Sequence, residues 1–542
     1  MTELSRYRLW LNWEAFEVAA INPLFTSDIS IEKISQLASK LPPLIEFVSF
    51  EQWKAAVSSV FRLNENQIQA LYATLTCFLT KDPQEALLQS QVYLTDSSCL
   101  PSFFTRGTDI LCYLFALFVK KKFRAVSELS NLEAFPNRKD NQEKRISTQN
   151  RDVSKSTPTV SHLVIKTNKE QSLYPLMVRF FINKLPEFLK IYSPDGLTRQ
   201  HVESFSFLVN GGPTFAHKHN SLAAVMGFFE NTDVEPSVRF LHALKTQLPI
   251  SKGAEDILNT KYDHAIVPTS PLSYRPLFPR STEFDKYENT TLDKPLLIEY
   301  ETTHTQEPPK YRLEVPETPC NVHVYNCRHA TIYICSSVLT VFISHCRDST
   351  IFIGAAVSVH LEACQNVKII CATRMAHLDA CQRCVAYMLV NTRPIVTGNC
   401  SRLVFAPYNA LYTKFGLDTL CIGINPQLNL WDKPIFLASL GAALFEKISP
   451  ANFRLFVVPM TWANVNPIVN APIPQEYSLA LEQKRQAIMS LKTDLEIIAA
   501  KDRALYEKLT DMIQGKGAKA IQDEGHMLEI TWLTNHCPDE KE

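Results

Sequence analysis

The sequence is short of glycine, has no excess of either charge and contains no long apolar run. Only 14 of its 542 residues are glycine. Neither a G-x-x-x-x-G-K-S/T motif nor a G-x-G-x-x-G motif occurs, which excludes the common glycine-rich phosphate sites. Lys plus Arg and Asp plus Glu number 55 each, a balance that argues against a dedicated nucleic-acid-binding protein. The longest apolar run, residues 110–119, is much shorter than the roughly 20 residues that span a bilayer.

Cysteine is not scarce, but its placement is unusual. The first residues lack the basic segment and hydrophobic stretch of a signal peptide, so we expect a soluble, intracellular chain with reduced thiols and no membrane insertion. Ten of the 14 cysteines nevertheless lie between Cys320 and Cys421. This concentration needs an explanation other than disulfide bonds.

The N-terminal half is predicted to be helical. Apolar residues at helical spacing predict an α-helical domain over residues 1–135, with a buried helix at 110–119. Residues 136–159 are polar and predict a disordered linker. A second helical block is expected over 160–266, in which Leu185-Pro186 ends a helix and Asn210-Gly211-Gly212-Pro213 forms a turn. Clustered prolines mark a stiff connector over 267–289.

An internal repeat predicts the fold of the next region. Five segments of alternating apolar residues end at Cys327, Cys346, Cys364, Cys381 and Cys400, which are 19, 18, 17 and 19 residues apart. A second short apolar strand follows within the first four units. A fixed period of about 18 residues with two-residue alternation inside it is typical of a parallel β-solenoid. The inward positions are then Val322/Val324, Val341/Ile343, Val359/Leu361 and Ala376/Leu378.

The solenoid also explains the cysteines, because a small apolar side chain suits a buried corner. The alternative is a zinc site, suggested by Cys381-Gln-Arg-Cys384. A single C-x-x-C pair without a second pair is a weak signal. We therefore predict no metal site and no cofactor.

The repeat and the residues that close it resemble a known family. The segments Asn399-Cys-Ser-Arg-Leu-Val-Phe-Ala-Pro-Tyr408, Leu420-Cys-Ile-Gly and Leu430-Trp431-Asp432 are similar to the domain of tubulin-binding cofactor C and the retinitis pigmentosa 2 protein. The resemblance covers residues 290–437 and implies a right-handed parallel β-helix. The expected fold class is thus α+β multidomain, with a helical N-terminal region, this β-helix and a C-terminal extension.

The resemblance also implies an activity that this sequence does not support. The family activates GTP hydrolysis on tubulin or Arf-like G proteins through an arginine finger in a Gln-x-Arg-x-His/Arg motif. Following the register back from Cys400 places the finger on His377, the glutamine on Met375 and the second basic residue on Asp379. A neutral histidine cannot replace a guanidinium at a phosphoryl group. We therefore predict no catalytic residue.

The outward row of the coils supplies the candidates for partner binding. His360 with Glu362 and His377 with Asp379 are expected to stack on adjacent coils as an exposed, charged row. A hydrolase or lyase that uses these carboxylates, or a Cys384–His377 nucleophile pair, is the alternative interpretation. Exposed carboxylates beside histidines are more often solvated surface charge.

The C-terminal extension, residues 438–542, contains a predicted long helix over 476–514. Apolar residues recur at spacings of three and four between Leu481 and Met512, interrupted by Lys484 and Asp502. This seam either packs on the rest of the chain or binds a coiled-coil partner.

Together these features predict a non-catalytic cytoskeletal adaptor. The resemblance implies an association with cytoplasm, cytoskeleton, centrosome and spindle pole. It also implies a role in positioning the centrosome and Golgi, with consequences for cell shape and migration. Cytoskeletal or centrosomal proteins, tubulin or an Arf-like GTPase are the expected partners. The alternative function is GTPase activation without the family arginine.

Overall fold

The computed structural model describes fifteen stretches of the chain: residues 8–11, 15–16, 29–80, 82–95, 105–133, 173–212, 221–226, 235–248, 296–299, 310–313, 322–325, 327–437, 445–458, 471–522 and 526–535. The predicted linker 136–159 and connector 267–289 lie outside these residues. The chain forms two compact units, Met1–Thr80 with Ser102–Asp293, and Lys81–Pro101 with Lys294–Glu542. Helix α5 (Pro83–Thr95) therefore groups with the C-terminal unit.

The first unit is mainly helical, as its apolar spacing predicts. Its elements are α2 (Ile31–Ala38), α3 (Phe50–Phe61), α4 (Glu65–Leu79), α6 (Gly107–Glu133), α9 (Leu173–Tyr192), α10 (Arg199–Ser204), α11 (Leu222–Val225) and α12 (Pro236–Gln247). Capping boxes at Ser49 and Asn64 fix where α3 and α4 begin. Residues 110–119 of α6 are all buried, which confirms the predicted buried helix. No helix among the described residues is long and apolar enough to cross a membrane.

Two local predictions in this unit are wrong. Helix α9 continues through Pro186, because residues beyond the proline are anchored by packing. The Phe188 ring stacks on Phe115 with centroids 4.1 Å apart, which offsets the lost backbone hydrogen bond. The second error is the expected turn after Asn210, where β2 (Val209–Gly212) instead pairs with β1 (Arg8–Leu11). That pairing joins segments about 200 residues apart, so local sequence gives no sign of it.

The second unit contains the predicted parallel β-helix. Its strands are β3 (Leu296–Glu299), β4 (Lys310–Leu313), β5 (Val322–Tyr325), β6 (Thr331–Ser344), β7 (Thr350–Glu362), β8 (Lys368–Asp379), β9 (Val385–Val390), β10 (Ile395–Thr397), β11 (Leu403–Pro407), β13 (Ile435–Phe436) and β14 (Phe445–Lys447). Their pairings are all parallel. The predicted inward pairs on β5 to β8 are buried and in register, which confirms the repeat.

The spacing between successive corner cysteines decreases from 19 to 17 residues for a single reason. Between β6 and β7 the register shifts by one residue at Ile334/Ser337, and between β7 and β8 it shifts again at Ile353/Ala356. Each of these two coils is therefore one residue shorter than the coil before it at the bend where the register shifts. This gives spacings of 19, 18 and 17 residues between successive corner cysteines. The cysteine corner keeps a constant geometry, so the thiols stay in one row.

Each cysteine corner has the same backbone pattern. The residue two positions after the cysteine has a positive φ at His329, Asp348, Asn366, Arg383 and Arg402. The thiol turns inward and donates to a carbonyl of its own corner, as Cys364 does to Glu362 at 3.4 Å and Cys381 to Asp379 at 3.4 Å. Cysteine thus fills a buried corner and satisfies a backbone acceptor there. These left-handed positions use no glycine, which agrees with the low glycine content of the chain.

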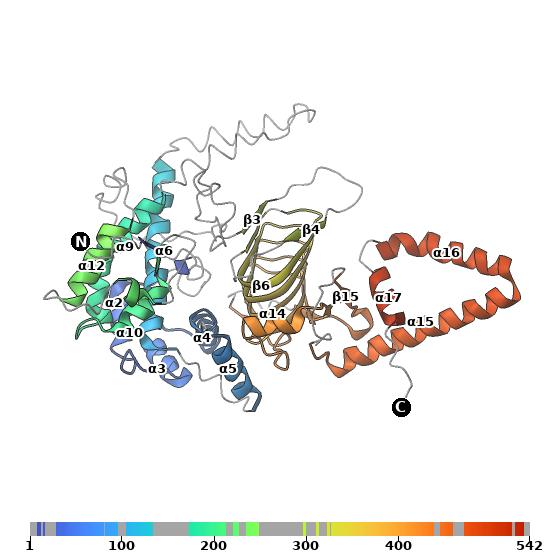
Figure 1. The fold of residues 1–542 in the computed structure, drawn as a ribbon, viewed down its shortest axis with the longest axis horizontal. Helices are drawn as coiled ribbons and strands as arrows, with labels where there is room; N and C mark the ends of the chain where they lie inside the picture. The colour runs from blue at the N-terminus through green and yellow to red at the C-terminus, as the bar shows by residue number, and fades with distance from the viewer. Residues whose placement is uncertain are drawn as a thin grey trace. The chain divides into compact units, whose positions relative to one another are not determined.

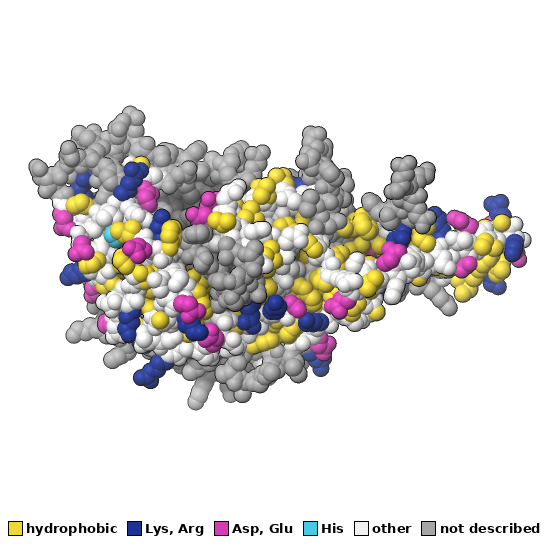
Figure 2. All heavy atoms as spheres, turned by 90° about the horizontal axis from the view of Figure 1, so that it is seen from below, with side chains coloured by type: hydrophobic (Ala, Val, Ile, Leu, Met, Phe, Trp, Pro, Cys, Tyr) yellow, Lys and Arg dark blue, Asp and Glu magenta, His cyan; other side chains and the backbone are white. Residues whose placement is uncertain are grey.

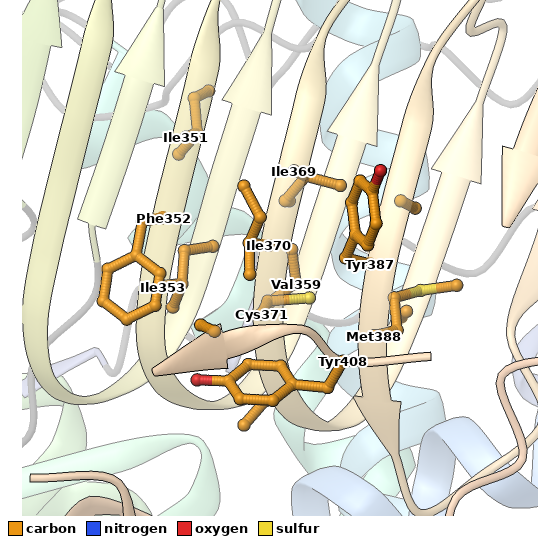
Figure 3. Close-up of a cluster of buried hydrophobic side chains, with 14 of the residues drawn as sticks. Ile351, Phe352, Ile353, Val359, Ile369, Ile370, Cys371, Tyr387, Met388 and Tyr408 are labelled. Atoms are coloured by element: carbon orange, nitrogen blue, oxygen red, sulfur yellow. The ribbon is translucent and has the colours of Figure 1, made fainter. Parts of the chain in front are cut away.

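One sheet of the solenoid is apolar on both surfaces. Ile351, Ile353 and Cys371 are buried on its inner surface, and Figure 3 shows them in close-up together with Phe352 and Tyr387. On the outer surface, Phe352 stacks on Phe456 of β15 (Phe456–Val457) at 5.9 Å. Tyr387 likewise lies 6.2 Å from Phe453. The extension after residue 438 therefore covers this sheet, which explains why its strands are continuously apolar rather than alternating.

The C-terminal extension ends in helices. The predicted single helix 476–514 is divided at Asp502 into α15 (Gln475–Lys501) and α16 (Arg503–Gln522), followed by α17 (His526–Asn535). Tyr477 and Leu481 of α15 are buried in the solenoid cluster. The first part of the seam therefore packs on its own chain, which was one of the two alternatives. The short helix α14 (Phe415–Cys421) packs against β6 and β7.

Candidate functional site

The position predicted for the family's arginine finger lies on β8, between two neighbouring strands of the solenoid. His377 is in register with His360 of β7 on one side and with Ile395 of β10 on the other. Two residues further along, Asp379 is in register with Glu362 and Thr397. The structure thus brings together the four predicted side chains and adds Thr397.

Four of these five side chains, all except Glu362, form a hydrogen-bonded chain across three strands. The Nδ1 atoms of His360 and His377 are 3.4 Å apart, and Nε2 of His377 lies 2.7 Å from Oγ1 of Thr397. The Thr397 hydroxyl donates to Oδ1 of Asp379 at 2.9 Å. We call this set, His360–His377–Thr397–Asp379, the histidine relay.

Asp379, the acceptor at the end of the relay, sets the donor and the acceptor of every hydrogen bond in it. The Thr397 hydroxyl donates its one proton to Asp379, so it accepts from Nε2–H of His377. A neutral imidazole with its proton on Nε2 has an acceptor at Nδ1, so His360 donates from its own Nδ1. Both ring nitrogens of His377 are therefore engaged within the protein.

Burial keeps the two imidazoles neutral. It lowers the pKa of His377 to about 4, although the adjacent Asp379 carboxylate raises it. Burial also lowers the pKa of His360 well below its ordinary value, and His377 lowers it further. The His360 ring stacks on Phe342 with centroids 5.5 Å apart. At neutral pH this site therefore presents no cationic histidine.

The expectation of an exposed row is wrong for the histidines. His360 is 5% exposed and His377 is 7% exposed, because their rings lie against Phe342, each other and Thr397. Glu362 and Asp379 are half-buried. Met375 is fully buried, and the Arg374 side chain is buried as well. The role of these residues in partner binding stays a prediction.

Sequence reasoning missed Thr397 because of one inserted residue. Glu362 and Asp379 each precede their corner cysteine by two positions, whereas Thr397 precedes Cys400 by three. The additional residue is Gly398, whose φ is +64°. A Cβ atom at Gly398 would lie 2.2 Å from Oδ1 of Asp379, so glycine is what allows the carboxylate to reach Thr397.

The alternative chemistries receive no geometric support among the described residues. No group of three or more His, Cys, Asp or Glu side chains in that part of the chain is placed to hold a metal ion. Cys384 is buried and donates to carbonyls of Cys364 and Gln382 rather than to His377. A nucleophile–base pair would need the thiol and the imidazole within hydrogen-bonding reach.

A second feature of this unit is a cavity of about 270 Å³ at the base of α15 and α17. It is lined mainly by apolar residues, among them Leu411, Leu481 and Trp532. Its charged residues Glu482 and Arg485 form an ion pair at 2.8 Å. The cavity therefore offers no unpaired acid or base for catalysis.

Comparison with known proteins finds a family match over the solenoid. Residues 320–435 match the family described as Tubulin binding cofactor C. The TBCC domain-containing protein 1 of Gallus gallus is 28% identical over 171 residues, which are 31% of this chain and 31% of that relative. The proteins of that name from Bos taurus and Homo sapiens are each 24% identical over 217 residues, 39% of either chain. The chain thus matches between 31% and 39% of the length of these relatives. The solenoid of this chain, over residues 320–435, is thus similar in sequence to the tubulin binding cofactor C family.

Proposed function

We propose that this domain is a non-catalytic binding platform for a cytoskeletal protein. The observation that carries the proposal is the histidine relay, in which the residue at the finger position is neutral and bonded on both nitrogens. We call the solenoid surface at the histidine relay the relay face. The half-buried Glu362 and Asp379 are the groups on this face that a partner can reach. The family name supports tubulin, or a protein related to it, as the partner.

The magnitudes favour binding over catalysis. An arginine finger contributes about 10³ to 10⁵ in rate by neutralising charge on the transferring phosphoryl group. That factor corresponds to roughly 4 to 7 kcal/mol of transition-state stabilisation. A neutral imidazole held inside the fold supplies neither the charge nor the paired donors. The adjacent Asp379 would place negative charge toward the phosphates.

Single-turnover GTP hydrolysis tests the proposal directly. With a saturating amount of this chain, hydrolysis by tubulin or by an Arf-like G protein is expected to stay within about twofold of its intrinsic rate, since no group supplies the finger's charge. Co-sedimentation with tubulin in the same samples is expected to show binding. An acceleration of tenfold or more that is lost in His377→Ala, but kept in a matched Arg383→Ala control on the exposed corner, would establish the GTPase-activating alternative.

We further propose, from the family resemblance, that the chain works at the centrosome and spindle pole. There it would help to position the centrosome and Golgi, with effects on cell shape and migration. A tagged full-length chain is expected to concentrate at the microtubule-organising centre. Diffuse staining in cells that contain intact centrosomes would contradict this proposal without affecting the GTPase result.

A further inference from the structure

The C-terminal helices form an arm whose apolar seam is only partly covered. Asp502 reverses the chain between α15 and α16: its N–H donates to the Ile498 carbonyl at 2.8 Å, and its Oδ1 accepts from the Leu505 N–H at 3.0 Å. The aspartate thus ends one helix and caps the next. Figure 1 shows α15 leading away from the solenoid and α16 returning. We call residues 489–512 the arm.

The apolar side chains of the two helices differ in exposure. Ile488, Leu495 and Leu509 are half-buried. Leu491 of α15 and Leu505 and Met512 of α16 are 51%, 45% and 48% exposed. None of residues 482–512 is buried. Ile498 is half-buried as well, so the open row of the arm consists of Leu491, Leu505 and Met512.

The open row lies in a polar part of the surface. Figure 2 shows apolar side chains at the free end of the arm among charged side chains of both signs. Exposed leucine and methionine in such a setting indicate an interface rather than ordinary surface.

The charge pattern of the arm indicates what covers the row. Residues 489–512 contain four basic and five acidic side chains, interspersed along both helices. A partner of strong net charge would meet like charges on this surface. A second copy of the same arm, related by a twofold axis, can place its acidic side chains opposite basic ones and its basic side chains opposite acidic ones. It also supplies an identical apolar row.

We propose that two copies of this chain associate through their arms, with the exposed Leu491, Leu505 and Met512 of each copy packed against those of the other in a four-helix arrangement. The solenoid and its relay face take no part in this contact. The inference therefore stands independently of the proposed function. It makes the molecule bivalent toward whatever the solenoid binds.

Sedimentation of the full-length chain tests the proposal. The wild type is expected to shift with concentration toward twice its 61.6 kDa mass. Leu491→Glu or Leu505→Glu is expected to weaken self-association at least about tenfold, because each twofold interface then contains two unpaired carboxylates. Leu479→Glu is the matched control, since Leu479 is 56% exposed on the same helix but lies outside the row. A wild-type mass of one chain at every concentration, or an equal loss in the control, would overturn the proposal.

Cross-linking distinguishes association from a folding defect of the variants. An equimolar mixture of unlabelled and ¹⁵N-labelled wild-type chain is expected to give mixed-isotope cross-links among Lys492, Lys501 and Lys508. Cross-links confined to single-isotope pairs would contradict the arm interface, whatever the variants do. Circular dichroism of the variants is expected to show unchanged helix content, because the substituted side chains are on the surface.

Discussion

Gly398→Ala is expected to destabilise the solenoid around β8 by about 3 kcal/mol. The φ of +64° at this residue is in the left-handed region, which costs a residue with a Cβ roughly 1–2 kcal/mol. The new Cβ would also lie 2.2 Å from Oδ1 of Asp379 and 2.9 Å from the backbone nitrogen of Ala380. The carboxylate must then move off Thr397, and a hydrogen bond to a charged group contributes about 1.5–3 kcal/mol.

Hydrogen exchange of the β8 amides in the full-length chain measures this loss locally, so global two-state unfolding is not required. A double-mutant cycle with Asp379→Ala separates the two causes. If the collision with the carboxylate matters, Gly398→Ala is expected to cost less in the Asp379→Ala background than in the wild type. Equal costs in both backgrounds would leave backbone strain as the whole effect and contradict the role assigned to this glycine.

Acidification is expected to weaken the same region strongly. An unfolded histidine has a pKa near 6.5, whereas burial lowers that of His377 to about 4. Below pH 6.5 the histidine is therefore protonated in the unfolded chain but stays neutral in the folded site. The free energy of unfolding falls as the pH drops toward 4. The slope is about 1.4 kcal/mol per pH unit, or about 2 kcal/mol by pH 5 from His377 alone. His360 acts in the same direction.

The measurement is the opening free energy of β7 and β8 amides between pH 7 and pH 5. His377→Gln is expected to flatten the pH dependence relative to the wild type, whatever its effect at pH 7. His329→Gln is the matched control, because His329 is exposed on a corner of the same solenoid. A slope that is unchanged by His377→Gln would show that the imidazole already titrates normally in the folded chain.

The solenoid could be predicted from the sequence because its repeat is local and its thiols mark each corner. Five agreeing registers fixed the inward residues of β5 to β8, and the structure has them there. The break at Asp502 was not predicted. A polar residue in a helical seam is compatible both with a continuous helix and with a capped reversal. The β1–β2 pair escaped prediction because distant pairing leaves no local pattern.

The candidate site could be located but not described from the sequence. Register counting places His360 and His377 side by side, as the structure does. Their burial and the part played by Thr397 depend on Phe342 and on the inserted Gly398. Such three-dimensional contacts decide whether a histidine is a surface charge or a neutral link, and spacing alone does not contain them.

The two-sided sheet of the solenoid limits how this protein can be divided. The stretch that matches the family ends at residue 435, before Phe453 and Phe456, which cover Tyr387 and Phe352. Excision at that boundary would uncover aromatic side chains on the outside of a sheet whose inside is already filled. Such a surface promotes aggregation. A soluble fragment of this chain that contains the solenoid therefore has to retain the segment through residue 458.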